Sequence, residues 1–161
     1  MKLSTLNDLY VEELKDLYSV ENQILKALPD MVEAATAPDL KAGFEAHLRQ
    51  TQEHVSRLDQ IFDKLGKSPR GKHCKGMEGI LAEGKELLKE KSEPEALDAG
   101  LITAAQHVEH YEIAGYGTVR TYAKLLGENE AMALLQQTLD EEEQTDQKLT
   151  KLSSKINVEA L

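Results

Sequence analysis

The apolar residues of this chain recur with a helical period in four long segments. In the first segment, Tyr10, Leu14 and Leu17 follow one another in steps of four and three, which is the spacing of a buried helix face. Similar stripes continue through the chain. They predict long helices over residues 5–36, 39–65, 93–126 and 129–156, with a shorter helix over 76–91. The pattern therefore predicts an all-α protein.

Residues typical of helix ends border these segments. Thr5, or Ser4 before it, can cap the first helix, and Gly66 is a typical stop signal for the second. The run Ser-Glu-Pro-Glu at 92–95 has the form of a capping box, and Asn129 is a candidate cap for the last helix. These signals divide the helices into two hairpins with short turns.

A long connection over residues 66–92 joins the two hairpins. One long crossover between helix pairs is typical of ferritin-like four-helix bundles, whereas a simple up-down-up-down bundle has a short central loop. With 161 residues, the chain has the length of one domain. We therefore expect a single ferritin-like domain over 1–161, a four-helix bundle with one long crossover that contains the short extra helix.

Composition narrows the classes of partner. The chain has 29 acidic and 19 basic residues, a net charge of −10, and no basic stripe, which disfavours nucleic acid and anionic membrane surfaces. Aromatic residues make up 4% and Trp is absent, which disfavours a β-rich fold. A single cysteine, Cys74, and the lack of a leader-like or membrane-spanning segment lead us to expect a cytoplasmic protein.

Several positions on the predicted buried faces are acidic instead of apolar. A carboxylate removed from water without a partner costs several kcal/mol or becomes protonated, and the same stripes contain no Lys or Arg. A metal cation would compensate these charges. The acidic stripe positions are Glu21, Glu109, Glu112, Glu142 and Asp146.

The second long helix contributes two histidines beside its buried face. At about 100° per residue, His47 and His54 flank Thr51, whereas Glu53 points toward solvent. His54 and Glu21 each lie about 16 residues from the first turn, which corresponds to about 24 Å along the bundle.

The carboxylates of the second hairpin have the same depth. Glu112 and the midpoint between Glu142 and Asp146 each lie about 16 residues from the second turn, so all these groups form one layer if both turns share an end. His47 would then lie about 10 Å from that layer and would act as a second-shell or core residue.

Oxygen-rich ligation with one imidazole suits two divalent ions that share carboxylates, with Fe favoured and Mn or Zn as alternatives. Of Glu109 and Glu112, one could bridge the two ions and the other could bind a single ion as a terminal ligand. Glu142 is the natural second bridging ligand. The predicted ligands are Glu21, His54, Glu109, Glu112, Glu142 and Asp146. The predicted supporting residues are His47, Thr51, Tyr18 and Tyr116.

Longer motifs carry a resemblance to a known family. The runs Leu-Lys-Asp-Leu-Tyr at 14–18, Cys-Lys-Gly-Met-Glu-Gly at 74–79 and Glu-His-Tyr-Glu-Ile-Ala-Gly-Tyr at 109–116 resemble YciF-like proteins, a small bacterial ferritin-like family associated with stress responses. The resemblance implies a dimeric ferritin-like bundle, similar to rubrerythrins around the metal layer, with a di-iron site.

The sequence departs from the wider ferritin-like pattern, which places Glu-x-x-His on the second and fourth long helices. Here those helices carry Thr51-x-x-His54 and Glu142-x-x-Thr145. Two functions stay open. One is a di-iron oxidoreductase of peroxidase-like type that reacts with O2 or peroxide, and the other is a metal-free stress or interaction protein with the same fold. Iron storage is the weakest interpretation.

Overall fold

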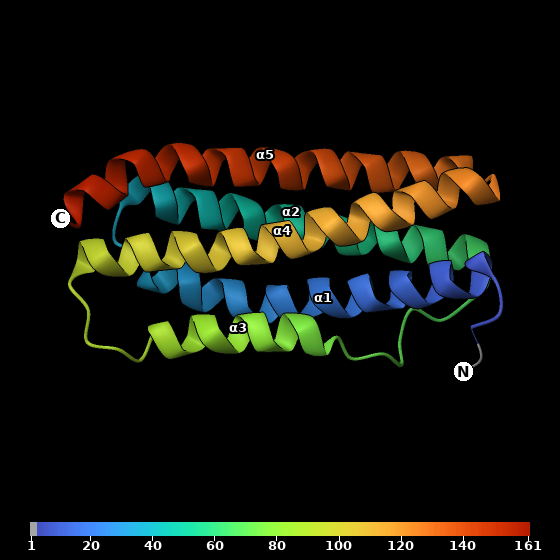
Figure 1. Cartoon of the computed structure of the whole chain (residues 1–161), viewed down its shortest axis with the longest axis horizontal. Coiled ribbons are helices and arrows are strands. Elements are labelled where there is room, and N and C mark those ends of the chain that lie inside the picture. Colours follow the sequence, from blue (N-terminus) through green and yellow to red (C-terminus); the bar gives the residue numbers. More distant parts are fainter. Residues whose placement is uncertain (1–2) are drawn as a thin grey trace.

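The computed structural model describes residues 3–161 and contains five helices (Figure 1). They are α1 (Leu6–Ala34), α2 (Pro38–Leu65), α3 (Lys75–Leu87), α4 (Pro94–Leu126) and α5 (Asn129–Glu159). The four long helices form a bundle, and α3 lies along its outside against α1 and α4. The described residues contain no strand. The all-α bundle with a helix in its long crossover is thereby confirmed.

The two hairpin turns lie at opposite ends of the bundle (Figure 1). Asp98, in the second turn of α4, accepts hydrogen bonds from the backbone N–H groups of Thr36 and Ala37 at 2.8 and 2.7 Å and from the Thr36 hydroxyl at 2.6 Å. The start of α4 therefore lies beside the α1–α2 turn. The condition that both turns share an end is not met, because α3 carries the chain back along the bundle before α4 begins.

Most helix ends follow their sequence signals. Thr5 and Asp8 form a reciprocal capping box at α1, and Gly66 ends α2 in the left-handed conformation that glycine adopts readily. Two expected caps are wrong. At α4 the cap position is Glu93, whose side chain makes no capping hydrogen bond, and Pro94 follows without an N–H to be satisfied. At α5 the connection is so short that Asn129 is already helical.

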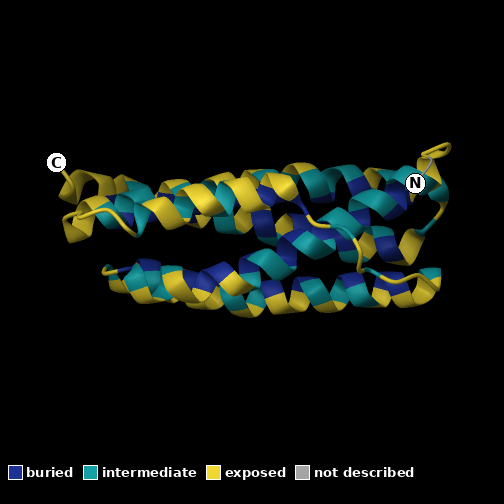
Figure 2. Ribbon diagram, turned by 90° about the horizontal axis from the view of Figure 1, so that it is seen from below, coloured by how far each residue is buried: buried dark blue, intermediate teal, exposed yellow. Residues whose placement is uncertain are grey.

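The helices bury their apolar faces in three clusters, with exposed residues on the outer faces (Figure 2). One cluster, which includes Tyr10 and Phe62, fills the end near the α4–α5 turn. A second, which includes Phe44 and Ile102, fills the end near the α1–α2 turn, and a third, around Met77, fixes α3 to the bundle. Polar residues occupy the bundle between the two end clusters. No helix in the described part of the chain has the length and apolar character to cross a membrane.

Candidate metal centre

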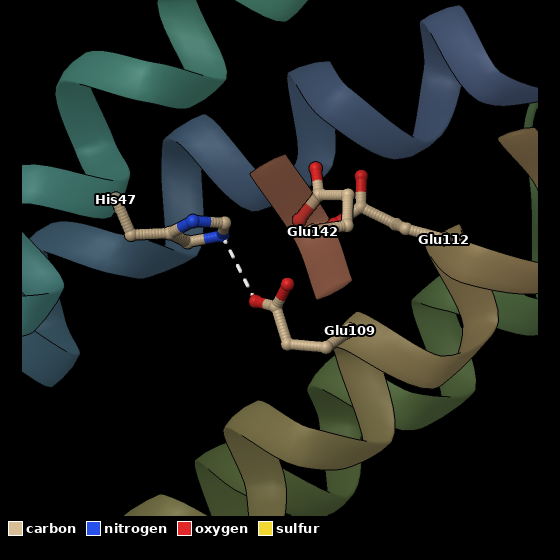
Figure 3. Close-up of side chains that lie close together, drawn as sticks. All are labelled: His47, Glu109, Glu112 and Glu142. Atoms are coloured by element: carbon tan, nitrogen blue, oxygen red, sulfur yellow. Dashed lines mark ion pairs between the residues drawn. The ribbon is translucent and has the colours of Figure 1, made fainter. Parts of the chain in front are cut away.

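Six acidic and histidine side chains meet in the middle of the bundle, all with 5% or less of their surface exposed. They form two overlapping groups, and within each group one ligand atom per residue lies within 4.8 Å of the others. The first group, which Figure 3 shows, is His47, Glu109, Glu112 and Glu142. The second group is Glu21, His54 and Glu142. Glu142 of α5 belongs to both groups, so the cluster extends along the bundle axis.

His47 lies inside the cluster and not beside it. Its Nε2 is 3.1 Å from Glu109 Oε1, the contact drawn dashed in Figure 3. The expected separation of about 10 Å is wrong, because the contact between Asp98 and Thr36 sets the relative depth of the two hairpins. Glu109 lies eleven residues beyond Asp98, and His47 lies eleven residues beyond Thr36, so the two side chains reach the same level.

His54 contacts carboxylates through both ring nitrogens. Its Nδ1 lies 2.9 Å from Glu142 Oε1 and 3.3 Å from Glu21 Oε1. Its Nε2 lies 2.9 Å from Glu141 Oε2. Arg57 donates two hydrogen bonds, of 2.7 and 2.9 Å, to the Glu141 carboxylate. A metal-ligating histidine usually donates its second N–H to such a carboxylate, which fixes the ring for ligation.

Sequence reasoning missed this support. Glu141 lies beside the stripe position of Glu142 in the acidic run at 140–143, yet its side chain turns toward α2. One feature of the sequence indicates that an acidic residue supports His54. Arg57 follows His54 by three residues, so both lie on the same face of α2 and can share one acidic partner.

Many ligand-type atoms of the cluster have no hydrogen-bond partner. Both carboxylate oxygens of Glu112 are buried without one, as are Oε2 of Glu142 and Nδ1 of His47. A buried polar atom without a partner costs about 1–3 kcal/mol. Since these atoms converge on two positions and are all metal-ligand types, the residues present fit two cations.

The electrostatics of the cluster show an excess of negative charge. Burial first, and then the charge of Glu142, raises the pKa of Glu109 and of Glu112 well above the usual range. Burial also lowers the pKa of His47, which favours its neutral, ligating form. The neutral forms of Glu109 and Glu112 are therefore favoured, and a divalent cation would reverse that preference.

His54 has the opposite balance. Burial alone would lower its pKa, but the charge of Glu21 and the hydrogen bonds to Glu141 and Glu142 raise the pKa to about 11. Burial would raise the pKa of Glu141, but its hydrogen bonds with His54 and Arg57 lower it to about 2. Without a metal, the protonated His54 is thus the positive charge beside Glu21 and Glu142.

The predicted supporting residues divide into near and distant ones. The Tyr116 hydroxyl donates a hydrogen bond to Glu21 Oε1, so Tyr116 contacts the cluster directly. Thr51 is buried on α2 but donates its hydroxyl to the backbone oxygen of His47 at 2.9 Å. Tyr18 packs edge-on against Phe62 at the end cluster, and its hydroxyl makes no hydrogen bond to the six residues.

Asp146 does not join either group. Its Oδ1 accepts a hydrogen bond from Gln106 at 3.1 Å and lies 3.2 Å from His110 Nε2, and its side chain is 20% exposed. It follows Glu142 by one helical turn, but α5 turns it toward the outer face of α4. The structure therefore brings together five of the six predicted ligands and adds His47.

Residues 5–161 match the family model described as "Domain of unknown function (DUF892)". The chain is 42% identical to protein YciF of Escherichia coli strain K12 over 155 residues, which cover 95% of this chain and 93% of the relative.

Solved structures agree with this match. The crystal structure of the E. coli stress protein YciF superposes with a TM-score of 0.92 at 39% identity, covering 96% of this chain and 98% of that one. YcfI of Rhodopseudomonas palustris, a candidate structural protein, gives a TM-score of 0.89 at 42% identity over 92% of this chain and 95% of that one. A ferritin-like diiron-carboxylate protein from Bacillus anthracis shares the fold, with a TM-score of 0.73 at 17% identity over 94% of this chain and 99% of that one.

Proposed function

The chain belongs to the family described as domain of unknown function DUF892, and we propose that it is a di-metal, di-iron carboxylate protein of bacterial stress defence that reacts with O2 or peroxide. One observation carries the proposal. Four carboxylates and two imidazoles are buried between apolar clusters, and many of their ligand-type atoms lack a hydrogen-bond partner. Two cations would satisfy these atoms and neutralise the carboxylates.

The donor set favours iron or manganese over a thiolate-type zinc site, because it consists of carboxylate oxygens and imidazole nitrogens. His47, Glu109 and Glu112 would hold one ion, and His54 and Glu21 would hold the other. Glu142 belongs to both groups, so its carboxylate could contribute to either site. Bound iron supplies the electrons for reaction with O2 or peroxide.

The chain's own residues orient this site. Glu141 and Arg57 hold His54 with its Nδ1 toward the cluster, and Tyr116 holds Glu21 through its hydroxyl. The two apolar end clusters exclude water from either end of the bundle. Such exclusion strengthens every electrostatic interaction of the site.

Anaerobic loading with ferrous ions followed by metal analysis tests the proposal. The wild type should retain about two equivalents, and the double variant Glu109→Ala, Glu142→Ala should retain almost none. Glu143→Ala is the matched control, since Glu143 is an exposed neighbour on α5. Less than one equivalent on the wild type would contradict the proposal. Loss of peroxide on mixing with the loaded protein would then measure the reaction.

A metal-free stress or interaction protein is the second candidate, and one observation favours it. His54 already supplies a positive charge between Glu21, Glu141 and Glu142. In this case, added iron would leave the melting temperature unchanged. For either candidate we propose a cytoplasmic homodimer, which light scattering on the purified protein would test.

A further inference from the structure

A cavity of about 80 Å³ opens between α2 and α5 and ends beside His47 and Glu109. Its wall is apolar, and every helix contributes to it. Leu28 of α1, Phe44 of α2, Leu81 of α3, Val108 of α4 and Leu149 of α5 line it. Leu28, Phe44 and Leu149 also belong to the buried clusters, so this part of the wall is packed core.

The inner end of this cavity is polar. His47 is 5% exposed; its Nε2 contacts Glu109 Oε1, and its Nδ1 has no hydrogen-bond partner. Glu109 is 1% exposed, and its Oε2 is also without a partner. A molecule in the cavity could therefore complete two hydrogen bonds that the folded chain leaves unmade, and each such bond favours binding.

The mouth of the cavity is formed by small residues on one side. Gly43 and Ala46, one turn apart on α2, line the cavity and are exposed. A Cβ atom on Gly43 would meet no atom within 4 Å. Across the mouth, Lys148 of α5 is exposed too. Gly43 and Ala46 leave this part of the cavity open, whereas Gln50 of α2 reaches α5 and accepts a hydrogen bond from the Thr145 hydroxyl at 3.3 Å.

Size and charge limit what the cavity can hold. At about 10–15 Å³ for each water-sized group, 80 Å³ accepts about five to eight such groups in a row or cluster. An anionic head group at the inner end would lie near the charged Glu142 carboxylate, which repels it. An anion held at the mouth by Lys148 would gain little, because that lysine is solvated.

We propose that this cavity is a binding site for neutral aliphatic compounds that carry one O–H head group, with the head at His47 and Glu109 and the chain against the apolar wall. Alcohols and alkyl hydroperoxides share this chemistry. Binding itself needs no metal, whereas the choice of hydroperoxides as the reacting members rests on the proposed function.

Titration of the metal-free protein with 1-hexanol, followed by methyl and histidine-ring NMR, tests the binding. We expect the signals of Leu28, Val108, Leu149 and His47 to shift together. Gly43→Leu, which fills the mouth from an exposed helical position, should weaken 1-hexanol binding at least tenfold. Ala46→Leu should act in the same way. Gly79→Leu is the control, since Gly79 is also an exposed helical glycine with open space at its Cβ, outside the cavity lining.

Hexanoate distinguishes the charge of the head group and should bind at least tenfold more weakly than 1-hexanol. Equal or tighter hexanoate binding would overturn the neutral-head assignment. Hexanol shifts that are absent, or that persist unchanged in Gly43→Leu and Ala46→Leu, would overturn the site itself.

Kinetics of the iron-loaded protein test whether alkyl hydroperoxides, and not only alcohols, use this cavity. There, Gly43→Leu should raise the KM for an alkyl hydroperoxide at least tenfold and change the KM for hydrogen peroxide less than twofold. An equal change in both KM values would overturn the assignment of hydroperoxides. A protein that binds 1-hexanol but retains no iron would contradict the proposed function and leave the binding site standing.

Discussion

His54 is the residue on which the geometry of one half of the cluster depends. Its two ring nitrogens serve different purposes, with Nδ1 toward Glu21 and Glu142 and Nε2 toward Glu141. Because Arg57 fixes Glu141 with two hydrogen bonds, the imidazole ring cannot rotate without breaking a buried pair. The cluster therefore depends on two residues that need not touch a metal.

Replacing Glu141 with Gln should weaken metal binding without removing a ligand. The amide accepts the His54 N–H less strongly than the carboxylate and leaves the Arg57 charge unpaired, and loss of such support typically costs 10–100-fold in affinity. Competition with a chelator of known affinity measures the effect. Glu143→Gln, one residue away and exposed, should bind metal as the wild type does. Equal affinity in both variants would show that the Glu141 contact does not orient the ring.

Replacing Glu112 with Gln should stabilise the metal-free protein. Burial first, and then the charges of Glu142 and Glu21, raises the pKa of Glu112. The folded state therefore binds this proton more tightly than the unfolded state, so stability falls as the pH rises above the ordinary carboxyl range. A neutral amide removes this loss. At pH 7 we expect a gain of about 1–2 kcal/mol, or a melting temperature about 2–8 °C higher.

The pH series checks the cause of that gain. The difference between variant and wild type should shrink toward pH 4, where Glu112 is protonated in both states. A constant difference at every pH would assign the gain to packing. With metal present the order should reverse, because the amide is a poorer ligand than the carboxylate.

At the scale of the helices, Asp98 sets the register on which the cluster depends. It accepts three hydrogen bonds from the α1–α2 turn, ends α1 at Ala34, and aligns the level of His47 with that of Glu109. Stripe periodicity predicted which faces the carboxylates occupy, because periodicity reports direction. Depth depends on how two hairpins slide past each other, and a tertiary contact decides that.

The sequence therefore predicted some parts of the site and not others. Glu21, Glu109, Glu112 and Glu142 were recognised because an acidic residue interrupts an apolar stripe. His47 was placed outside the layer, because its level was counted from turns assumed to share an end. Asp146 follows Glu142 by four residues and looks equivalent on a helical wheel, yet its side chain reaches Gln106.

Asp98→Ala should destabilise the fold by about 2–4 kcal/mol, because it removes the buried carboxylate that accepts hydrogen bonds from two backbone N–H groups of the α1–α2 turn. Urea unfolding measures this loss. Glu95→Ala is the control, since Glu95 is exposed in the first turn of the same helix and should change stability by less than about 0.5 kcal/mol. Asp98→Asn, which keeps one acceptor oxygen, should fall between the two. Equal stability of Asp98→Ala and Glu95→Ala would contradict the role of this contact.

At the scale of the whole molecule, the polar cluster lies between two apolar ends. Tyr10, Leu58 and Phe62 fill one end, and Leu40, Ile102 and Leu149 fill the other. Since burial of each large apolar side chain contributes about 1.5–3 kcal/mol, the bundle has stability that does not come from a metal. This distinguishes it from small metal-dependent domains, which unfold without their ion.

Removal of metal by a chelator should therefore lower the melting temperature without unfolding the protein at 25 °C. For an ion at about 1,000 times its Kd, the loss is about 4 kcal/mol, or about 8–16 °C for a chain of this size. Circular dichroism should show unchanged helix content at 25 °C. The double variant Glu109→Ala, Glu142→Ala should melt at one temperature with or without chelator. A wild type that loses its helix content on chelation would show that the apolar ends cannot hold the bundle alone.

Glu142 is the residue that α5 supplies to the two groups of ligand-type atoms, and it belongs to both. If this residue were to hold two ions, their binding would be coupled, because the first ion would fix the orientation and offset the charge of the Glu142 carboxylate. The resulting coupling free energy is reciprocal, so each ion alters the affinity for the other by the same factor. If two ions bind, a metal titration curve should depart from that of two identical, independent sites, and the Glu142→Ala variant should lose this interdependence.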